Sequence, residues 1–416
     1  MSYSALRAGG VPYGSPGAAW RDRGLCAVGG DQIRVAMIHG PAPADLDGVS
    51  DYVERLMHAL GDVGVATASV PVRGDGSTAG WLTATLRAAR EVWRLRPDVV
   101  HVQFAPSAYR FSGLPGLLPP LLPPYAPLVT TLHEYGWWAA PTWVPDAVWR
   151  PLERARLWDR ETGRLVPASR AVVVTNGGHA RQVGLRTRGR PIEVPLAPNV
   201  ADHGGPAPDG LGPERTGEVL AFFGFVHPVK GIRYLLEAVA RLRAGRPSLR
   251  LLVIGGFTSQ ALPEAEAGAF RAELEALAEG LGVADAVTFT GHLPAAAVSE
   301  ALHAADVGVL PFTGGVTAKS GALLTMLAHG LPTAITVPDE PGPSALDGAV
   351  AVIPARRDAA AIAGALERLL DDAALRRRLA GAGRRVSAGH SWSGVAAAHR
   401  ELYDSLVGSA YGRRHA

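Results

Sequence analysis

Short β-rich apolar runs alternate with amphipathic helical patterns along most of this chain, and this alternation restricts the fold more than any other feature. The first series contains expected strands at residues 33–38, 65–72, 99–102, 128–132 and 171–175, with expected helices starting near Ser50 and covering 83–95. In the helix after Ser50, apolar side chains recur at the i, i+3, i+4, i+7 spacing of one helix face: Val53, Leu56, Met57 and Leu60. Strands that alternate with helices in this way predict a parallel sheet covered by helices.

A second series of the same kind follows residues 201–217, which are rich in Gly and Pro and poor in apolar side chains, as linkers are. Its expected strands are 219–224, 249–254, 287–290 and 307–311, and its expected helices are 231–242, 264–281 and 322–330. The chain turns helical and charged after residue 356, and a last helix at about 393–408 follows a cap-like Ser391-Trp392-Ser393 segment.

We therefore expect an α/β fold class with two doubly wound, Rossmann-like domains. The predicted parts are a flexible N-terminal tail at 1–32, a first domain at 33–205, a second domain at 206–390 and a C-terminal helix at 391–416 that can cross back to the first domain. Ligands bind such sheets beyond the carboxyl ends of the strands. With two facing domains, the predicted site lies in the cleft between them.

The composition fits this picture and argues against several other classes. A chain of 416 residues is expected to hold about two domains. The formal charge is only +3 and the basic residues are scattered, which argues against nucleic acid as the main partner. No run of 18 apolar residues is present, so we expect no membrane span. With a single cysteine, Cys26, and no signal-peptide pattern, we expect a cytoplasmic protein without an internal disulfide.

A Gly-rich loop at residues 314–321 is the clearest candidate for a phosphate site. It reads Gly-Gly-Val-Thr-Ala-Lys-Ser-Gly and connects the expected strand 307–311 to the expected helix 322–330. A helix N-terminus presents free backbone N–H groups and the positive end of a dipole to an anion. Lys319 and Ser320 add a cation and a hydroxyl at this helix entrance.

A second strand–turn–helix segment, residues 222–231, places Lys230 at another helix start. Such a lysine is equally well explained as a solvated side chain when the segment is considered alone. Two such loops in one domain, each with a lysine, predict a diphosphate held from two sides. The first loop is not a P-loop, because a Walker A sequence ending at Lys319-Ser320 requires glycines where Thr313 and Ala318 stand.

The order of motifs resembles the retaining glycosyltransferases of the GT-B fold, family 4, over about residues 33–405. In the second half the resemblance rests on Phe223-Gly224 with Lys230-Gly231, on Phe289-Thr290-Gly291-His292-Leu293, and on segments 304–311 and 328–332. In the first half it rests on segments 48–53, 98–101, 131–134 and 198–200. The resemblance implies two Rossmann-like domains with the active site in the cleft between them.

The family implies a nucleotide-diphosphate sugar as donor substrate, held mainly by the second domain, and an acceptor bound in the first. No separate cofactor or metal is expected, and no metal-binding motif is visible among the 13 histidines. Carried over by position, the residues implied for the donor diphosphate are Lys230, Lys319, Ser320, Gly321, Gly48 and Val49. Those implied for the sugar are Gly315, Val316 and Thr317. Those implied for the base and ribose are Gly291, His292, Leu293 and Thr325.

The resemblance places His133 at the reaction centre, and Tyr52, Glu134 and Trp137 on the acceptor side. Without the resemblance, His133 is as well explained as a packed residue after a buried strand. Retention in this family is thought to proceed by front-face attack, in which the leaving phosphate oxygen accepts the proton of the acceptor. No protein nucleophile is then required.

This chain departs from the family pattern at three positions. Two glutamates that usually touch the sugar and the ribose are replaced by Thr317 and Thr325, and the usual Gly-Arg of the first phosphate turn is Gly224-Phe225. We hypothesise that Lys319 substitutes for the missing arginine. The departures keep other interpretations open: a sugar phosphorylase, a nucleotide-sugar hydrolase, or an inactive partner that binds a sugar nucleotide.

A segment that pairs Leu with Pro, residues 114–125, lies near four tryptophans: Trp137, Trp138, Trp143 and Trp149. Aromatic, Pro-rich loops can form a groove for a bulky acceptor. They can also contact a membrane surface, since Trp favours such interfaces. A packed loop covering the sheet explains the same residues. The sequence leaves the nucleotide base, the sugar, the acceptor (a small specialised metabolite or a saccharide) and the oligomeric state open.

Overall fold

The computed structural model describes residues 32–43, 47–187, 189–204, 217–258, 262, 264–317, 319–337, 346 and 348–414. They form two six-stranded sheets with strand orders β2-β1-β3-β4-β5-β6 and β12-β11-β10-β7-β8-β9. Neighbouring strands run parallel in both sheets, as the alternation of strands and helices predicted. The predicted tail (except its last residue) and most of the predicted linker lie outside the described residues, and the domain boundaries stay predictions.

The first sheet contains the five strands expected from the sequence and one more at its edge. Its strands are β1 (Arg34–His39), β2 (Ala66–Pro71), β3 (Val99–Phe104), β4 (Leu128–Leu132), β5 (Ala171–Val174) and β6 (Ile192–Glu193). Its helices are α1 (Gly48–Asp62), α2 (Thr78–Leu95), α3 (Asp146–Arg154), α4 (Leu165–Ala168) and α5 (Gly177–Thr187). Strand β6 escaped prediction because it is two residues long and exposed.

The second sheet is built from β7 (Val219–Phe223), β8 (Arg250–Ile254), β9 (Val287–Gly291), β10 (Val307–Leu310), β11 (Thr333–Thr336) and β12 (Ala351–Ile353). Its helices are α6 (Ile232–Arg243), α7 (Glu264–Gly280), α8 (Ala295–His303), α9 (Gly321–Ala328), α10 (Ala359–Asp371) and α11 (Ala373–Ala388). Each sheet has its own hydrophobic core, as expected for two domains.

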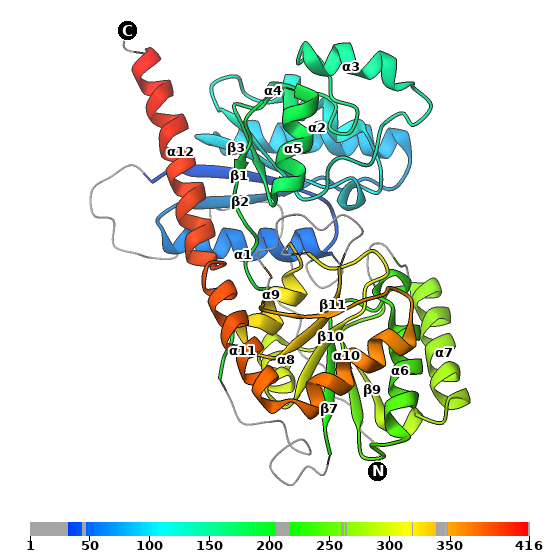
Figure 1. Cartoon of the computed structure of the whole chain (residues 1–416). Helices are drawn as coiled ribbons and strands as arrows, with labels where there is room; N and C mark the ends of the chain where they lie inside the picture. Colours follow the sequence, from blue (N-terminus) through cyan, green and yellow to red (C-terminus); the bar gives the residue numbers. More distant parts are fainter. Residues whose placement is uncertain are drawn as a thin grey trace, which may run out of the picture.

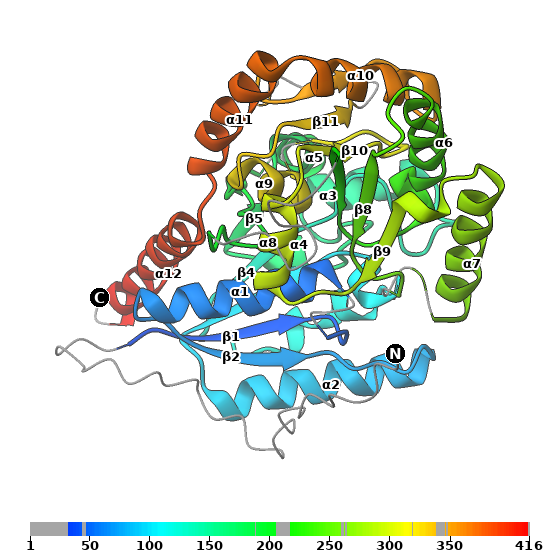
Figure 2. The same ribbon diagram turned by 90° about the horizontal axis from the view of Figure 1, so that it is seen from below.

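The last helix, α12 (Trp392–Arg414), returns to the first sheet and lies beside α1 (Figures 1 and 2). Tyr403 of α12 is fully buried in the first core, together with Val395 and Ala396. The start of the helix is capped, because Ser391 Oγ accepts a hydrogen bond of 3.1 Å from Gly394 N. The chain therefore crosses between the domains twice, near residues 196–204 and near residue 390.

The Leu- and Pro-rich segment forms two short 3₁₀ turns, η2 (Leu114–Leu117) and η3 (Pro119–Leu121), that pack on α2. Leu118 is buried, and Trp93 Nε1 donates a hydrogen bond of 2.9 Å to Leu121 O. This segment is thus the packed loop that the sequence left as one of three interpretations. Trp149 is also buried, whereas Trp137 and Trp143 are 61% and 80% exposed.

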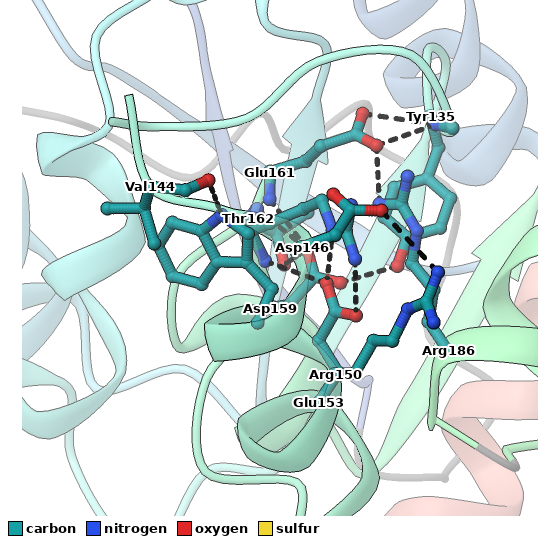
Figure 3. Close-up of polar contacts among 12 residues, drawn as sticks. Tyr135, Val144, Asp146, Arg150, Glu153, Asp159, Glu161, Thr162 and Arg186 are labelled. Carbon is teal, nitrogen blue, oxygen red and sulfur yellow. Dashed lines mark hydrogen bonds and ion pairs between the residues drawn. The ribbon is translucent and has the colours of Figure 1, made fainter. Parts of the chain in front are cut away.

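A buried ionic cluster fixes the long connection between β4 and β5 (Figure 3). Asp159 accepts hydrogen bonds from Tyr135 Oη at 2.5 Å and from Thr162 N at 2.8 Å. Glu161 accepts from Gly136 N at 2.8 Å and pairs with Arg186 of α5 at 2.5 Å. Because hydrogen bonds to charged groups are stronger than neutral ones, this cluster holds the residues that directly follow β4 in place.

Candidate active site

Two cavities lie side by side between the domains, at the carboxyl ends of the strands. The first, which we call the His133 cavity, has a volume of about 290 Å³. The second, the His292 cavity, has a volume of about 330 Å³. Gly48, Asp51 and Asn199 line both of them, so the cavities meet at the start of α1.

Two helix N-termini face the junction of these cavities. Helix α1 begins at Gly48, and α9 begins at Gly321, which lines the His133 cavity, followed by Ala322, which lines the His292 cavity. Figure 1 shows α1 and α9 on opposite sides of the boundary between the domains. The positive dipole ends of both helices therefore point at the place where a ligand would bridge the cavities, with Ser50 N already capped by Asp47 Oδ2 and Leu323 N by Ser320 Oγ.

The side chain of Asn199 lies between the start of α1 and the start of α9 and contacts both. Its Nδ2 donates a hydrogen bond of 3.2 Å to Asp51 Oδ2 on α1. A Cβ added at Gly321 would lie 1.6 Å from Asn199 Oδ1, so a side chain at position 321 would collide with it. Glycine at the first position of α9 thus leaves the space that the Asn199 side chain occupies, and any larger residue would force that side chain to move.

The His292 cavity has a floor of backbone at the ends of β7 and β8. Gly224 and Gly255 adopt φ values of +128° and +145°, and a Cβ at Gly255 would lie 2.1 Å from Gly224 O. His292 and Leu293 form one wall, as the resemblance implied for a base site, and Arg55 of α1 lies on the side of the first domain. The cavity can therefore hold a flat ring against its backbone floor, with the apolar side chain of Leu293 and the guanidinium of Arg55 around it.

In the His133 cavity, His133 lies directly after β4 and its side chain is half-buried. Its Nε2 is 2.8 Å from Gln103 Oε1, and its ring packs edge-on against Tyr52 at a centroid distance of 4.7 Å. Burial lowers the pKa of His133 to about 3, so the imidazole is neutral at physiological pH. This histidine can accept or donate a hydrogen bond but carries no charge.

Glu134 and Tyr52 line the same cavity and carry unused polar atoms. Glu134 Oε1 accepts a hydrogen bond of 2.9 Å from Ser107 Oγ, whereas Glu134 Oε2 and Tyr52 Oη are enclosed without a partner among the described residues. Burial raises the pKa of Glu134. Trp392 of α12 completes the wall next to Tyr52, at a centroid distance of 5.2 Å.

Lys230 and Lys319 are the only lysines in the whole sequence, and the other basic side chains besides histidine are arginines. Lys319 lines the His133 cavity beside the start of α9. Lys230 Nζ lies 3.8 Å from the ring centroid of Phe312, at the end of β10, and has no carboxylate partner within the described part of the chain. Burial lowers the pKa of Lys230 to about 8.

Several predicted site residues have other roles in the structure. Val316 is buried in the second core, and Thr325 is fully buried with its Oγ1 accepting from Val200 N at 3.2 Å, so neither side chain lines a cavity. The prediction of direct contacts by these two side chains is corrected, because linear spacing does not reveal which way a loop or helix side chain points. Ser320 Oγ caps α9 by accepting from Leu323 N at 3.3 Å.

The remaining predicted positions lie at or near the cleft. Gly48, Val49, Tyr52, Glu134, Lys319 and Gly321 line the His133 cavity. The other predicted residues that line neither cavity are Lys230, Gly291, Gly315, Thr317, Ser320 and Trp137, and Trp137 is exposed instead. Thr317 Oγ1 is enclosed and has no hydrogen-bond partner among the described residues, at the position where the resembled family carries its first glutamate.

Sequence reasoning missed residues that reach the cleft only through tertiary structure. Arg55 pairs with Asp51 one turn earlier on α1 at 2.9 Å, a signal that the i, i+4 spacing could have given. Asn199 lies in a family-like segment but received no role. Trp392 arrives from the far end of the chain, and its Nε1 donates to Pro198 O at 2.9 Å.

One group of potential metal ligands occurs in the part of the chain that the structure describes: Asp202, His303 and His329. His303 Nε2 is 2.7 Å from Asp202 Oδ1, and the two nitrogens of His329 are 2.8 Å from Thr325 O and 2.9 Å from Ser299 Oγ. Hydrogen bonds therefore already occupy these ligand atoms. Over the same described ranges, no helix combines the length and apolarity needed to cross a membrane.

Comparison with known proteins agrees with this architecture. A family model described as "Glycosyl transferases group 1" matches residues 217–372. D-inositol 3-phosphate glycosyltransferase of Segniliparus rotundus is 30% identical over 256 residues, which cover 60% of this chain and 52% of that protein. Phosphatidyl-myo-inositol mannosyltransferase of Mycobacterium leprae is 28% identical, covering 52% and 54%. The chain thus spans about half the length of these curated relatives.

Solved structures share the fold over nearly the whole chain. Sucrose-phosphate synthase from Thermosynechococcus elongatus superposes with a TM-score of 0.66 at 20% identity, covering 91% of this chain and 100% of that one. Anabaena HepE, in complex with UDP and glucose, gives a TM-score of 0.60 at 13% identity, covering 90% and 100%. Residues 217–372 of this chain therefore match the glycosyl transferases group 1 family model, and the chain as a whole has the GT-B fold.

Proposed function

We propose that this protein is a retaining glycosyltransferase that moves a sugar from a nucleotide-diphosphate sugar to an acceptor. The observation that carries the proposal is the meeting of the α1 and α9 N-termini at the junction of two cavities, Gly48 on one side and Gly321 on the other. A diphosphate is the part of the donor that needs such donors. The match of the second domain to the family model supports the same reaction class.

In this proposal the base and ribose occupy the His292 cavity and the diphosphate lies at the junction. The transferred sugar and the acceptor then share the His133 cavity. Lys230 and Lys319 supply positive charge from two loops of the second domain, and Lys319 takes the place of the arginine that the first phosphate turn lacks. The donor is a substrate, and no separate cofactor is needed.

The proposed chemistry is a front-face displacement. The bond from the anomeric carbon to the phosphate oxygen breaks, the bond to the acceptor oxygen forms on the same face, and the acceptor proton passes to the leaving phosphate oxygen. Negative charge grows on the diphosphate as the bond breaks. Preorganised N–H groups and lysines stabilise that charge more in the transition state than in the ground state.

The test is a thermal-shift screen with UDP, GDP, TDP and ADP, followed by UDP-glucose, TDP-glucose, ADP-glucose and GDP-mannose. One of these should raise the melting temperature, since a ligand at a hundredfold excess over Kd stabilises by about 2.7 kcal/mol. Lys319→Ala should then weaken binding of the selected diphosphate. Unchanged affinity in that variant would remove Lys319 from the diphosphate site, and no stabilisation by any compound would contradict the proposal.

A second candidate, an inactive partner that binds a sugar nucleotide, is favoured by one observation. Neither usual glutamate position is acidic, since Thr317 is enclosed without a hydrogen-bond partner in the described part of the chain and Thr325 is buried. A sugar phosphorylase or a nucleotide-sugar hydrolase would fit the same cavities. Turnover of the selected nucleotide sugar separates them: transfer to an acceptor supports our proposal, release to water or to inorganic phosphate supports the other enzymes, and no turnover supports the inactive partner.

The exposed tryptophans support a further, separate proposal of peripheral membrane contact. Trp137 and Trp143 are exposed on the connection between β4 and β5. The ring of Phe111 packs edge-on against that of Trp137, with 5.9 Å between the ring centroids. Indole rings are favoured at membrane interfaces. Co-sedimentation with phosphatidylglycerol-containing liposomes should decrease in Trp143→Ser, and a failure of the wild type to pellet would contradict the contact.

A further inference from the structure

Gln103 is a buried amide that touches the imidazole of His133. It lies on β3, is fully buried, and its Oε1 is 2.8 Å from His133 Nε2. The other end of the amide, Nε2, is 3.1 Å from Met37 Sδ and 3.3 Å from His101 Nε2. Both neighbours can accept a hydrogen bond, so the NH₂ group points to them and the carbonyl oxygen points to His133.

This amide orientation determines the tautomer of His133. A carbonyl oxygen can only accept, so the proton of the neutral imidazole must be on Nε2. His133 Nδ1 then carries a lone pair. No described residue donates to that nitrogen, it is absent from the enclosed polar atoms without a partner, and the residue lines the cavity. Nδ1 is therefore the polar atom that His133 presents to a ligand.

A chain of buried contacts holds Gln103 in this orientation. His101 Nε2 is also 2.7 Å from Thr131 Oγ1, and His101 Nδ1 is 2.6 Å from Tyr403 Oη on α12. The lone pair on His101 Nε2 is consistent with a proton on Nδ1 that is donated to Tyr403. Burial lowers the pKa of His101 well below its ordinary value, so this second histidine is neutral as well.

We propose that Gln103 is a positioning residue that fixes His133 as the Nε2–H tautomer, so that Nδ1 accepts a hydrogen bond from a hydroxyl of the transferred sugar. The tautomer follows from the geometry of the free protein, whereas its use on the sugar rests on the proposed function. A histidine in the opposite tautomer would present a donor at the same point and lose that hydrogen bond. The tautomer thus determines whether His133 can accept a hydrogen bond from the sugar hydroxyl.

The first test measures the tautomer directly by NMR of histidine labelled with ¹³C and ¹⁵N, with His133→Gln to assign the signal. Wild-type His133 should show the Nε2–H pattern and no titration from pH 8 to pH 5. Gln103→Leu should lose the single tautomer. Wild-type His133 with its proton on Nδ1, or Gln103→Leu with an unchanged pattern, would overturn the proposal, whatever the enzyme does to nucleotide sugars.

The second test uses Gln103→Glu, which has nearly the same shape but a carboxylate facing His133 Nε2. The carboxylate should raise the pKa of His133 and convert Nδ1 into a donor at low pH. The titratable groups around His133 are Tyr52, Glu134, His101, His179 and His399, and they are unchanged in this variant. We expect kcat to fall at least tenfold below pH 7 and to recover at higher pH, with nucleoside diphosphate affinity within twofold of the wild type.

Gln182→Glu on α5 is the matched control, because Gln182 lines neither cavity. This variant should change neither the pH dependence of kcat nor the affinity for the nucleoside diphosphate. A wild-type pH profile for Gln103→Glu would contradict the positioning role. The nucleotide sugars of the screen also test the contact itself: the selected one should shift His133 Nδ1, whereas its nucleoside diphosphate should not. If no compound binds, the proposed function fails, yet the tautomer measurement still decides the role of Gln103.

Discussion

At the scale of single residues, the most informative group is Lys230, a cation that has been placed on a phenylalanine ring rather than next to a carboxylate. Its Nζ lies 3.8 Å from the Phe312 centroid, and burial lowers its pKa to about 8. Among the residues that the structure describes, no carboxylate pairs with this amine, so it is available to an anion. Burial of this charged amine destabilises the free protein, and a bound anion would offset that unfavourable free energy.

The lowered pKa makes nucleotide binding pH-dependent. Lys230 is charged below pH 8 and loses its charge as the pH rises through that value, so the affinity for a nucleoside diphosphate should fall between pH 7 and pH 9. Lys230→Met should bind at least tenfold more weakly at pH 7, since a charged hydrogen bond contributes about 1.5–3 kcal/mol. Isothermal titration at both pH values checks this, and an equal affinity of wild type and variant would contradict the role of Lys230.

At the scale of elements, the start of α9 depends on a glycine. In Gly321→Ala the new methyl group would overlap Asn199 Oδ1, so the Asn199 side chain would have to move and its Nδ2 would lose the hydrogen bond to Asp51 at the junction of the two cavities. We expect weaker binding of the nucleoside diphosphate and a lower melting temperature. Gly364→Ala on α10 is the control: its Cβ would meet nothing within 4 Å, and alanine is preferred in helices by up to about 1 kcal/mol. Equal behaviour of the two variants would contradict this role of Gly321.

The ionic cluster of Figure 3 is the second element with a measurable contribution. Arg186→Met would leave Glu161 buried without its cation, although Gly136 N still donates to it. Removing one partner of a buried pair costs about 3–5 kcal/mol, so chemical denaturation should show a loss of about 3 kcal/mol. Arg94→Met, at a pair with 78% exposure of the arginine side chain, should be nearly neutral. A neutral Arg186→Met would show that the cluster is not needed to hold this connection.

The elements also show what a sequence can and cannot provide. Strands such as β5 and β10 were predicted because strands buried in a parallel sheet are nearly continuous apolar runs, and that pattern is local. The loop before α9 was recognised from its glycines and Lys319. The burial of the Val316 and Thr325 side chains could not be predicted, because it depends on how the loop and helix pack. Trp392 reaches the cleft only because α12 returns to the first domain, which no local pattern specifies.

At the scale of the whole molecule, buried histidines link stability to pH. Burial lowers the pKa of His39, His179 and His399 to about 4 and that of His133 to about 3. The unfolded chain binds protons at these positions below about pH 6.5 and the folded chain does not, so folding stability is lost as the pH falls from 6.5 toward 4. Each proton of difference changes the stability by about 1.4 kcal/mol per pH unit.

Carboxyl groups of raised pKa act in the opposite direction, because burial raises the pKa of Asp47, Asp51 and Glu134 from ordinary values near 4. The four histidines begin to act as the pH falls through 6.5, so we expect them to dominate between pH 6.5 and pH 5. The melting temperature should fall steadily over that range in thermal denaturation. A flat or rising melting temperature would contradict the neutral, buried state of these four histidines.

The proposed transfer reaction depends on one location, the junction between the α1 and α9 N-termini, as the site of the donor diphosphate. Because Lys230 and Lys319 are the only lysines, reductive methylation with ¹³C-formaldehyde yields just two lysine signals, plus that of the N-terminus. Titration with the nucleoside diphosphate selected by thermal shift should move both lysine signals together and leave the N-terminal signal in place. A diphosphate that binds without moving either lysine signal would contradict the proposed donor site.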